Sequence, residues 1–247
     1  MERADRAPVG TFYAPGAWSA GDAVQLPEGA AHHALVRRFS VGDAVRLTSG
    51  DGRRAMGRIT QLGKGRLAVT LDGESLEIIT ALPPIALWAP IGDRDRMLML
   101  AEKAAELEVS SWRPVMYARS RSVSPRGEGE AFAEKVRARM VGALEQSGGA
   151  WMPDLQREAA LDVALREQPE GSGVRLLLDA DGETLGEIVR ALDAPVSIAL
   201  GPEGGLAESE RDAFIRAGWR PVSLGANVLR FETAAIAALA IVRSLSR

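Results

Sequence analysis

From Ile85 onward, the chain alternates short apolar runs with longer amphipathic segments. The apolar runs are IALWAP, WRPVMY, VRLLLD, VSIALG and RPVSLG, and segments such as DRDRMLMLAEKAAELEV and ESERDAFIRAG lie between them. Runs of this length are typical of strands buried on both faces, as in a parallel sheet covered by helices. The alternation therefore predicts an α/β domain that binds ligands at the carboxyl ends of its strands.

The residues before Ile85 follow a different pattern. Residues 11–80 hold short β-prone segments broken by turn signals, with one short helical segment, GAAHHALVRRF, among them. The tetrapeptide SGDG at residues 49–52 lies between two such segments and predicts a β-hairpin. Pro83 and Pro84 mark a boundary, because proline resists both helix interiors and central strands. We therefore expect a small β-rich domain over residues 1–82 and the α/β domain over residues 83–247.

Composition limits the available chemistry. The chain of 247 residues is 46% apolar, which suffices for one large or two small globular domains. It has no cysteine, and its two histidines, His32 and His33, are adjacent. Adjacent residues of a helix point about 100° apart and do not face one ligand. We expect neither disulfides nor a metal site.

No segment resembles a signal peptide or a membrane span. The longest apolar stretch near the C-terminus, residues 234–242, is far short of the roughly 20 residues that a membrane helix needs. We therefore expect a soluble, cytoplasmic protein with no membrane partner.

The net charge of −3 is unevenly distributed. Between residues 30 and 70 basic side chains outnumber acidic ones, and Arg37, Arg38, Arg53, Arg54 and Arg58 lie in this stretch. The excess indicates either a surface that follows a phosphate backbone or an ordinary solvated face. Composition does not decide between these two interpretations.

The stretch IALGPEGGLAESE, residues 198–210, ends an apolar run in a glycine-rich loop. Gly201, Gly204 and Gly205 allow the backbone to approach a ligand closely, and loops of this kind most often bind phosphate. Here Glu203 stands at the centre of the loop, which carries no Lys or Arg. The loop therefore favours a ligand that is not an anion.

Three common kinds of active site do not fit. A Rossmann site needs GxGxxG after the first strand of its domain, and nothing after IALWAP matches. A P-loop is excluded because GK[ST] does not occur. A Ser-His-Asp triad would need a histidine in the α/β domain, and both histidines precede it.

The segment NVLRFETAA, residues 227–235, forms a strand-to-helix junction. Glu232 and Thr233 are suited to capping the helix that follows. Arg230 lies on the carboxyl side of a strand, where ligands bind, and has the stronger claim to chemistry. For Glu232, capping and catalysis both remain open.

A set of motifs in collinear order adds a resemblance. The motifs are HHALVRRFSVGD, GDRDRMLMLAEKAAELEVSSWRPV, ARSRSV, ALEQSGG, GPEGG and AGWRPVSLGANVLRFETAA. Together they closely resemble the RsmE family, the 16S ribosomal RNA uracil-N3 methyltransferases that use S-adenosylmethionine. The resemblance implies an N-terminal PUA-like β-barrel that binds RNA, a C-terminal SPOUT α/β domain with a trefoil knot, and a homodimer. Sequence rules alone would not predict a knot, since connections normally avoid threading.

The resemblance also implies where the cofactor and the small-subunit RNA bind. The cofactor would be held by two knot loops, which here contain Leu200, Gly201, Pro202, Glu203, Gly204, Gly205, Leu224, Gly225, Val228, Leu229, Arg230 and Thr233. S-adenosylmethionine carries a sulfonium and an ammonium group, so an acidic glycine loop suits it better than it suits a phosphate. RNA contacts are expected from His32, His33, Arg37, Arg38, Arg53, Arg54, Arg58 and Arg121.

The chain departs from the family pattern at several positions. These are Ala226 and Asn227 for Pro-Arg, Phe231 for Thr, Gly149 for Arg, Thr11 for Arg, and Ala207 for a helix-capping Ser. The lost arginines affect the RNA contacts and the choice of target, whereas the glycine loops are intact.

Methylation of uridine at N3 requires removal of a proton from a weak acid and alignment of the nitrogen with the methyl group. Arg230 is expected to stabilise the uridine anion, and it cannot be the base because its side chain is protonated at ordinary pH. Glu203 and Glu232 are candidate proton acceptors, and the base is unassigned. Two alternatives stay open: a knotted methyltransferase acting on another RNA or on a ribose 2'-hydroxyl, and a non-catalytic RNA-binding assembly factor.

Overall fold

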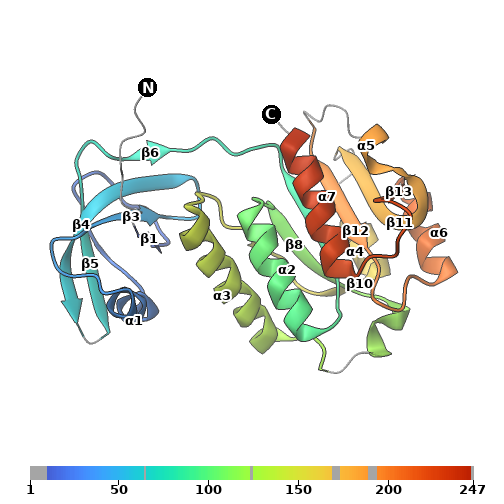
Figure 1. Cartoon of the computed structure of the whole chain (residues 1–247), viewed down its shortest axis with the longest axis horizontal. Coiled ribbons are helices and arrows are strands. Elements are labelled where there is room, and N and C mark those ends of the chain that lie inside the picture. Colours follow the sequence, from blue (N-terminus) through green and yellow to red (C-terminus); the bar gives the residue numbers. More distant parts are fainter. Residues whose placement is uncertain (1–9, 64, 123–124, 169–172, 189–193, 246–247) are drawn as a thin grey trace. The chain divides into compact units, whose positions relative to one another are not determined.

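The computed structural model describes residues 10–63, 65–122, 125–168, 173–188 and 194–245 (Figure 1). Contacts divide the chain into two units, one of residues 1–81 with 141–152 and one of residues 82–140 with 153–247. The first boundary between the units, after residue 81, lies one residue before the boundary expected after residue 82. The segment 141–152, expected in the second domain, groups with the first unit instead.

Hydrogen bonds explain the grouping of residues 141–152. The Tyr13 amide donates to Glu145 Oε1 at 2.8 Å. The Thr48 hydroxyl donates to the Gly149 carbonyl at 2.8 Å, and Arg54 donates to the Gly148 carbonyl at 3.0 Å. Such contacts join residues far apart in the sequence, so sequence periodicity carries no sign of them.

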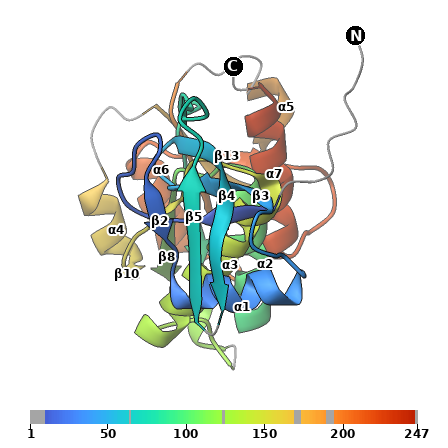
Figure 2. The ribbon, with the colours of Figure 1, turned by 90° about the vertical axis from the view of Figure 1, so that its left-hand side faces the viewer.

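The first unit is built on a mixed β-sheet with helix α1 beside it (Figure 2). Its elements are β1 (Thr11–Tyr13), β2 (Ala23–Gln25), α1 (Glu28–Val36), β3 (Ala44–Thr48), β4 (Arg53–Gly63), β5 (Arg66–Leu71) and β6 (Glu77–Ile78). The strands pair in the order β1-β3-β4-β5-β2, with β6 beside β4; β1 and β3 are parallel and the other pairs antiparallel. Among the described residues, the path of pairing is open, running from β1 to β2.

The predicted hairpin at residues 49–52 is confirmed, since β3 and β4 pair antiparallel on either side of it. Gly50 and Gly52 have φ values of 80° and 98°, the left-handed region that glycine adopts at little cost. A Cβ on Gly52 would lie 2.5 Å from the Trp151 ring, so the close approach also requires glycine.

The second unit is an α/β domain with a wholly parallel sheet, as the alternation predicts. Its strands are β7 (Ile85–Pro90), β8 (Ser111–Met116), β9 (Asp154–Leu155), β10 (Ala159–Ala160), β11 (Val174–Thr184), β12 (Val196–Leu200) and β13 (Arg220–Ser223). Its helices are α2 (Arg94–Glu106), α4 (Leu161–Glu167), α5 (Leu185–Ile188), α6 (Glu208–Arg216) and α7 (Phe231–Leu245), with the 3-10 turn η1 (Ala118–Ser122). Helix α3 (Glu130–Ser147) begins in this unit, and its end groups with the first.

Both faces of the central strands are buried. Leu87, Ile198 and Leu176 stand side by side in register on β7, β12 and β11, and all three are fully buried. Their neighbours Trp88, Ala199 and Leu177 pack on the opposite face with α4 and α6, in a core that includes Phe214 and Trp219. Successive side chains point to opposite faces, and both faces are buried. The sequences of these strands are therefore apolar at nearly every position.

The order of the strands in the sheet determines where the segment between β13 and α7 crosses the strand ends. The sheet runs β10-β8-β7-β12-β11-β13, with β9 beside β8, so β12 is inserted between β7 and β11. After edge strand β13, helix α7 packs against β12 and α2. Residues 224–230 therefore pass over the carboxyl ends of the inner strands to reach it. The knot itself stays a prediction. In the part of the chain that the structure describes, no helix is long and apolar enough to span a bilayer.

The core around α6 yields a stability prediction. Phe214 is fully buried, with its ring centroid 5.1 Å from that of Trp219 and 6.2 Å from that of Trp88. Phe214→Ala should lower the free energy of unfolding by about 3–5 kcal/mol, because it leaves a cavity. Its neighbour Ile215 is 43% exposed, and Ile215→Ala should change it by less than about 0.5 kcal/mol. Equal losses in urea titrations of the two variants would contradict the assignment of this core.

Candidate functional site

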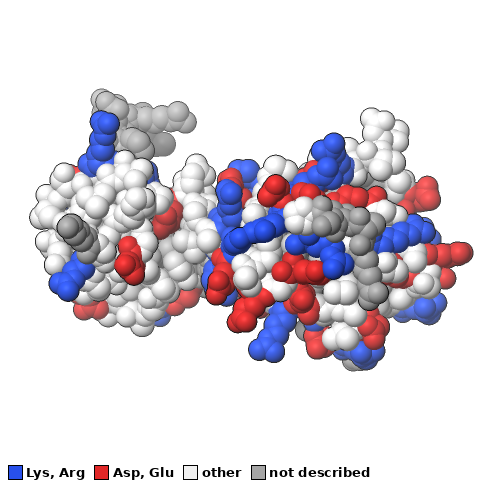
Figure 3. Space-filling view, turned by 90° about the horizontal axis from the view of Figure 1, so that it is seen from below, with Lys and Arg blue, Asp and Glu red and all other residues white. Residues whose placement is uncertain are grey.

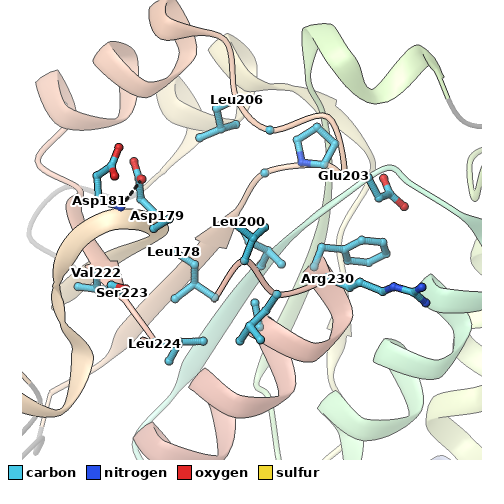
Figure 4. A pocket seen from close by; sticks show the side chains of 18 of the residues that line it. Leu178, Asp179, Asp181, Leu200, Glu203, Leu206, Val222, Ser223, Leu224 and Arg230 are labelled. Atoms are coloured by element: carbon cyan, nitrogen blue, oxygen red, sulfur yellow. Dashed lines mark hydrogen bonds between the residues drawn. The ribbon is translucent and has the colours of Figure 1, made fainter. Parts of the chain in front are cut away.

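A cavity of about 540 Å³ lies at the carboxyl ends of β11, β12 and β13 in the second unit (Figure 4). Leu178, Leu200 and Leu224, one from each of these strands or the loop after it, form an apolar floor. Asp179 and Asp181 lie on one side of the floor and Glu203 on the other (Figure 4). The volume falls within the roughly 300–1,000 Å³ that is usual for small-molecule sites.

The glycine loop after β12 needs its glycines for geometric reasons. A Cβ on Gly201 would lie 3.0 Å from the Leu206 side chain, and a Cβ on Gly204 would lie 3.2 Å from the Arg119 side chain. Gly205 has a φ of 71°, which strains any other residue. The loop is held in place by Arg119, which donates to the Gly204 carbonyl at 2.9 Å.

Helix α6 begins directly after this loop with an unusual cap. Ala207 stands at the N-cap and offers no side-chain acceptor. Glu210 compensates, because its carboxylate accepts from the Ala207 amide at 2.8 Å and from the Ala118 amide at 2.7 Å. The missing capping Ser is thus offset by a carboxylate in the first turn, where the helix dipole favours negative charge.

Glu203 is attached to the start of helix α2. Its Oε1 accepts from the Asp93 amide at 3.3 Å and lies 3.7 Å from Arg96 Nη1. A Cβ on Gly92 would lie 3.1 Å from the Glu203 carboxylate, so a larger residue there would make the carboxylate shift. The central acid of the glycine loop is therefore fixed by a segment more than a hundred positions earlier.

The second loop, residues 224–230, contributes Arg230 to the cavity wall. The side chain of Arg230 is exposed and makes no hydrogen bond or ion pair with the described residues, while its carbonyl accepts from the Ala234 amide at 2.9 Å. Glu232, in the first turn of α7, is 4% exposed, and its Oε2 has no hydrogen-bond partner within the described parts of the chain. Thr233 is exposed, and no hydrogen bond from either side chain caps α7 among the described residues.

Most of the residues expected to bind a cofactor line this one cavity. They are Leu200, Gly201, Pro202, Glu203, Gly205, Leu224, Gly225, Val228, Leu229 and Arg230. Gly204, Glu232 and Thr233 do not line it. The two glycine-containing loops, one after β12 and one after β13, therefore meet at this cavity.

Other lining residues were not singled out from the sequence as site residues. Asp179 and Asp181 follow the apolar part of β11, and Arg211 Nε lies 2.6 Å from Asp179 Oδ2. Arg96 comes from α2. Acids at the end of the run VRLLLD were a usable signal, since strand ends are where ligands bind. The arginines carried no such signal, because they reach the cavity from helices.

The expected RNA-contacting residues of the first unit do not form one free basic surface. Arg53 pairs with Asp51, Arg54 pairs with Glu77 at 3.2 Å, and Arg58 donates to the carbonyl of Gly42. On the face seen in Figure 3, Lys and Arg side chains of this unit stand in separate places. In the second unit, basic and acidic side chains are interspersed on that face (Figure 3).

The other members of that set in the first unit lie in or just after α1. His32, Arg37 and Arg38 are exposed, and Arg37 stacks over the Phe39 ring at 5.6 Å. His33 Nδ1 lies 3.9 Å from Glu145 Oε2. Burial raises the pKa of Glu145, against the opposing effects of the Tyr13 amide and of His33 and Arg37. Arg121 belongs to η1, and its side chain lies outside the described residues.

Comparison with protein families matches both parts of the chain. Residues 80–243 match the model of an RNA methyltransferase domain, and residues 26–72 match that of an RNA methyltransferase PUA domain.

Among the described residues, no group of three His, Asp or Glu side chains is arranged to hold a metal ion.

Curated relatives carry one name. The chain is 34% identical to ribosomal RNA small subunit methyltransferase E of Treponema pallidum over 46% of this chain and 45% of that protein. It is 26% identical to the protein of that name from Rickettsia conorii, over 76% of this chain and 75% of the other. The match thus spans under half of the Treponema protein's length and three quarters of the Rickettsia protein's.

Two solved structures match nearly the whole chain. A putative methyltransferase from Legionella pneumophila, in complex with the bound cofactor SAM, gives a TM-score of 0.85 at 27% identity, over 96% of this chain and 98% of that one. Ribosomal RNA small subunit methyltransferase E from Neisseria gonorrhoeae, bound to S-adenosyl methionine, gives 0.82 at 29% identity over the same shares.

The left-handed glycine of the loop yields a second prediction. Gly205→Ala should lower the free energy of unfolding by about 1–2 kcal/mol, because its φ of 71° is unfavourable for any residue with a Cβ. Gly186→Ala is the matched control, since Gly186 lies in α5 with open space around it, and this change should be neutral or stabilise by up to about 1 kcal/mol. Denaturant titration measures both; an unchanged Gly205→Ala variant would show that the loop relaxes freely.

Proposed function

Since the chain belongs to the RsmE family of RNA methyltransferases, we propose that it transfers a methyl group from S-adenosylmethionine to N3 of a uridine in 16S ribosomal RNA of the small subunit. The observation that carries the proposal is the meeting of the two glycine loops at a single cavity. The cavity lies where parallel sheets bind ligands, and the loops are those that the resemblance assigns to the cofactor.

The residues of the cavity fit the proposed cofactor. S-adenosylmethionine supplies an electrophilic methyl group on a sulfonium, and it also carries an ammonium, a carboxylate and an apolar purine face. The floor of Leu178, Leu200 and Leu224 suits the apolar part. Walls that carry both carboxylates and guanidinium groups suit a ligand with charges of both signs. The whole cavity is therefore less acidic than the glycine loop alone.

Arg230 has the position and freedom for the electrostatic role. It lines the cavity and is not committed to any carboxylate among the described residues. A guanidinium placed beside a uracil carbonyl stabilises the anion that forms as the N3 proton leaves. Of the two candidate proton acceptors, Glu203 lines the cavity and Glu232 is buried away from it.

The first unit is proposed to bind the RNA, and two copies of the chain are proposed to form a dimer in the cytoplasm. Exposed Arg37 and Arg38 support the former, because cations at a surface contact phosphates at low cost. Val228 supports the latter: it is 90% exposed, although apolar, and a second copy would cover such a side chain.

The proposed reaction is tested by transfer of labelled methyl from S-adenosylmethionine to RNA from cells that lack this protein. Small subunits, large subunits and naked 16S RNA are assayed in parallel, followed by nucleoside analysis. Label in 3-methyluridine of the small-subunit RNA supports the proposal. Label in another RNA or on a ribose hydroxyl would replace it with a related methyltransferase activity. RNA binding without any transfer would favour a non-catalytic assembly factor.

Replacement of Arg230 tests its role. Arg230→Ala should lower turnover by about 10²–10³-fold with little change in cofactor affinity, because it removes a group that acts on the forming anion. Arg216→Ala, at an exposed position on α6, is the control and should leave both unchanged. Single-turnover kinetics and calorimetry give the two quantities. Equal loss of turnover and affinity would mean that Arg230 only shapes the cavity.

Replacement of Arg37 and Arg38 together tests the RNA surface. The double change to Ala should reduce the slope of log affinity against log salt by about 2, since each phosphate contact contributes about 1. Arg166→Ala with Arg216→Ala removes the same charge from exposed sites in the second unit. Filter binding over a salt series measures the slope; an identical slope for both variants would place the RNA elsewhere.

A further inference from the structure

Three charged side chains from distant segments meet beside the cavity. Arg96 lies in the first turn of α2, Glu203 in the loop after β12, and Glu232 in the first turn of α7. Arg96 Nη1 lies 3.7 Å from Glu203 Oε1, and Arg96 Nε lies 3.8 Å from Glu232 Oε1. One guanidinium therefore stands between the two carboxylates that compete for the role of proton acceptor.

Glu232 depends on this guanidinium. Its side chain is 5% exposed, and among the described residues its Oε2 has no hydrogen-bond partner and Arg96 is the cation recorded within ion-pair distance of it. A buried carboxylate is costly unless it is paired, so the contact with Arg96 offsets that cost. Glu232 is not among the residues that line the cavity, whereas Arg96 and Glu203 are. The ion pair with Arg96 therefore links Glu232 to the cavity wall.

Glu203 is restrained from the same side. Besides Arg96, it has the Asp93 amide at 3.3 Å, a long hydrogen bond from the start of α2. The positive end of the helix dipole adds to this attraction. Both contacts of Arg96 exceed hydrogen-bond length, and contacts of this kind often tighten when substrate binds. Arg96 is thus placed to fix the direction of the Glu203 carboxylate.

We propose that Arg96 is a positioning residue for methyl transfer: buried Glu232 orients Arg96, and Arg96 holds the Glu203 carboxylate at the cavity wall, where it accepts the N3 proton. This inference rests on the proposed function. In the step, the N3–H bond breaks and its proton passes to Glu203. The N3 electron pair then bonds to the methyl carbon while the carbon–sulfur electrons remain on sulfur as a neutral thioether. Glu203 afterwards releases the proton to water.

A double-mutant cycle separates this role from a general structural one. Arg96→Ala should lower kcat by about 10²-fold, the cost of a small misplacement at a reacting group, and Glu203→Gln by about 10²-fold or more. In the double variant the two losses should not add, because Arg96 acts through Glu203. Because Arg96 and Glu203 also line the cofactor cavity, cofactor affinity is measured for all three variants and kcat is compared at saturating cofactor.

Two conservative changes and one control complete the test. Arg96→Lys should recover part of the activity because it keeps the charge, and Glu232→Gln should lower kcat less than Arg96→Ala does. Arg94, in the same turn of α2, stacks over the Phe132 ring at 5.9 Å and does not line the cavity, so Arg94→Ala should leave kcat unchanged. Thermal melting checks that each variant is folded.

The outcomes distinguish the inference from the function on which it rests. Additive losses in the double variant, or a folded Arg96→Ala protein with full kcat, would overturn the positioning role while the methyltransferase assignment stands. Absence of methyl transfer by the unchanged protein to any RNA would instead overturn the proposed function, and the inference with it.

Discussion

The insertion of β12 between β7 and β11 is the constraint on which the site depends. Because all pairs in this sheet are parallel, the strands end at one edge, and the loops after β11, β12 and β13 must share it. Helix α7 then has to return from the sheet edge to pack on β12 and α2. The crossing of residues 224–230 over the strand ends follows from that return, and the crossing closes the cavity.

Most of the charged side chains at the cavity come from parts of the chain outside the glycine loop. The loop itself brings Glu203, while Arg96, Arg211 and Arg230 arrive from two helices and from the crossing segment. Arg96 and Arg211 are engaged with carboxylates, whereas Arg230 has none among the described residues. The electrostatic design therefore keeps one guanidinium available for charge that develops on a substrate, which is where a preorganised group contributes most to a rate.

Sequence reasoning predicts those features that local chemistry determines. The hairpin at residues 49–52, the buried parallel strands and the meeting of the two glycine-bounded loops follow from turn chemistry, apolar runs and strand direction. The grouping of residues 141–152 with the first unit and the placement of Arg96 between Glu203 and Glu232 do not. These depend on contacts between residues that lie far apart in the sequence, for which a single sequence holds no periodic signal. In the basic stretch, the sequence shows an excess of arginine but not which arginines form ion pairs. The structure pairs Arg53 with Asp51 and Arg54 with Glu77.

The most direct test of the account is a crystal structure of the protein with S-adenosylhomocysteine and a short uridine-containing RNA. The account predicts ligand density on the floor of Leu178, Leu200 and Leu224, with the sulfur facing a uracil N3 that lies beside Arg230 and Glu203. Density for the ligand outside this cavity, or a uracil bound away from Arg230, would contradict it.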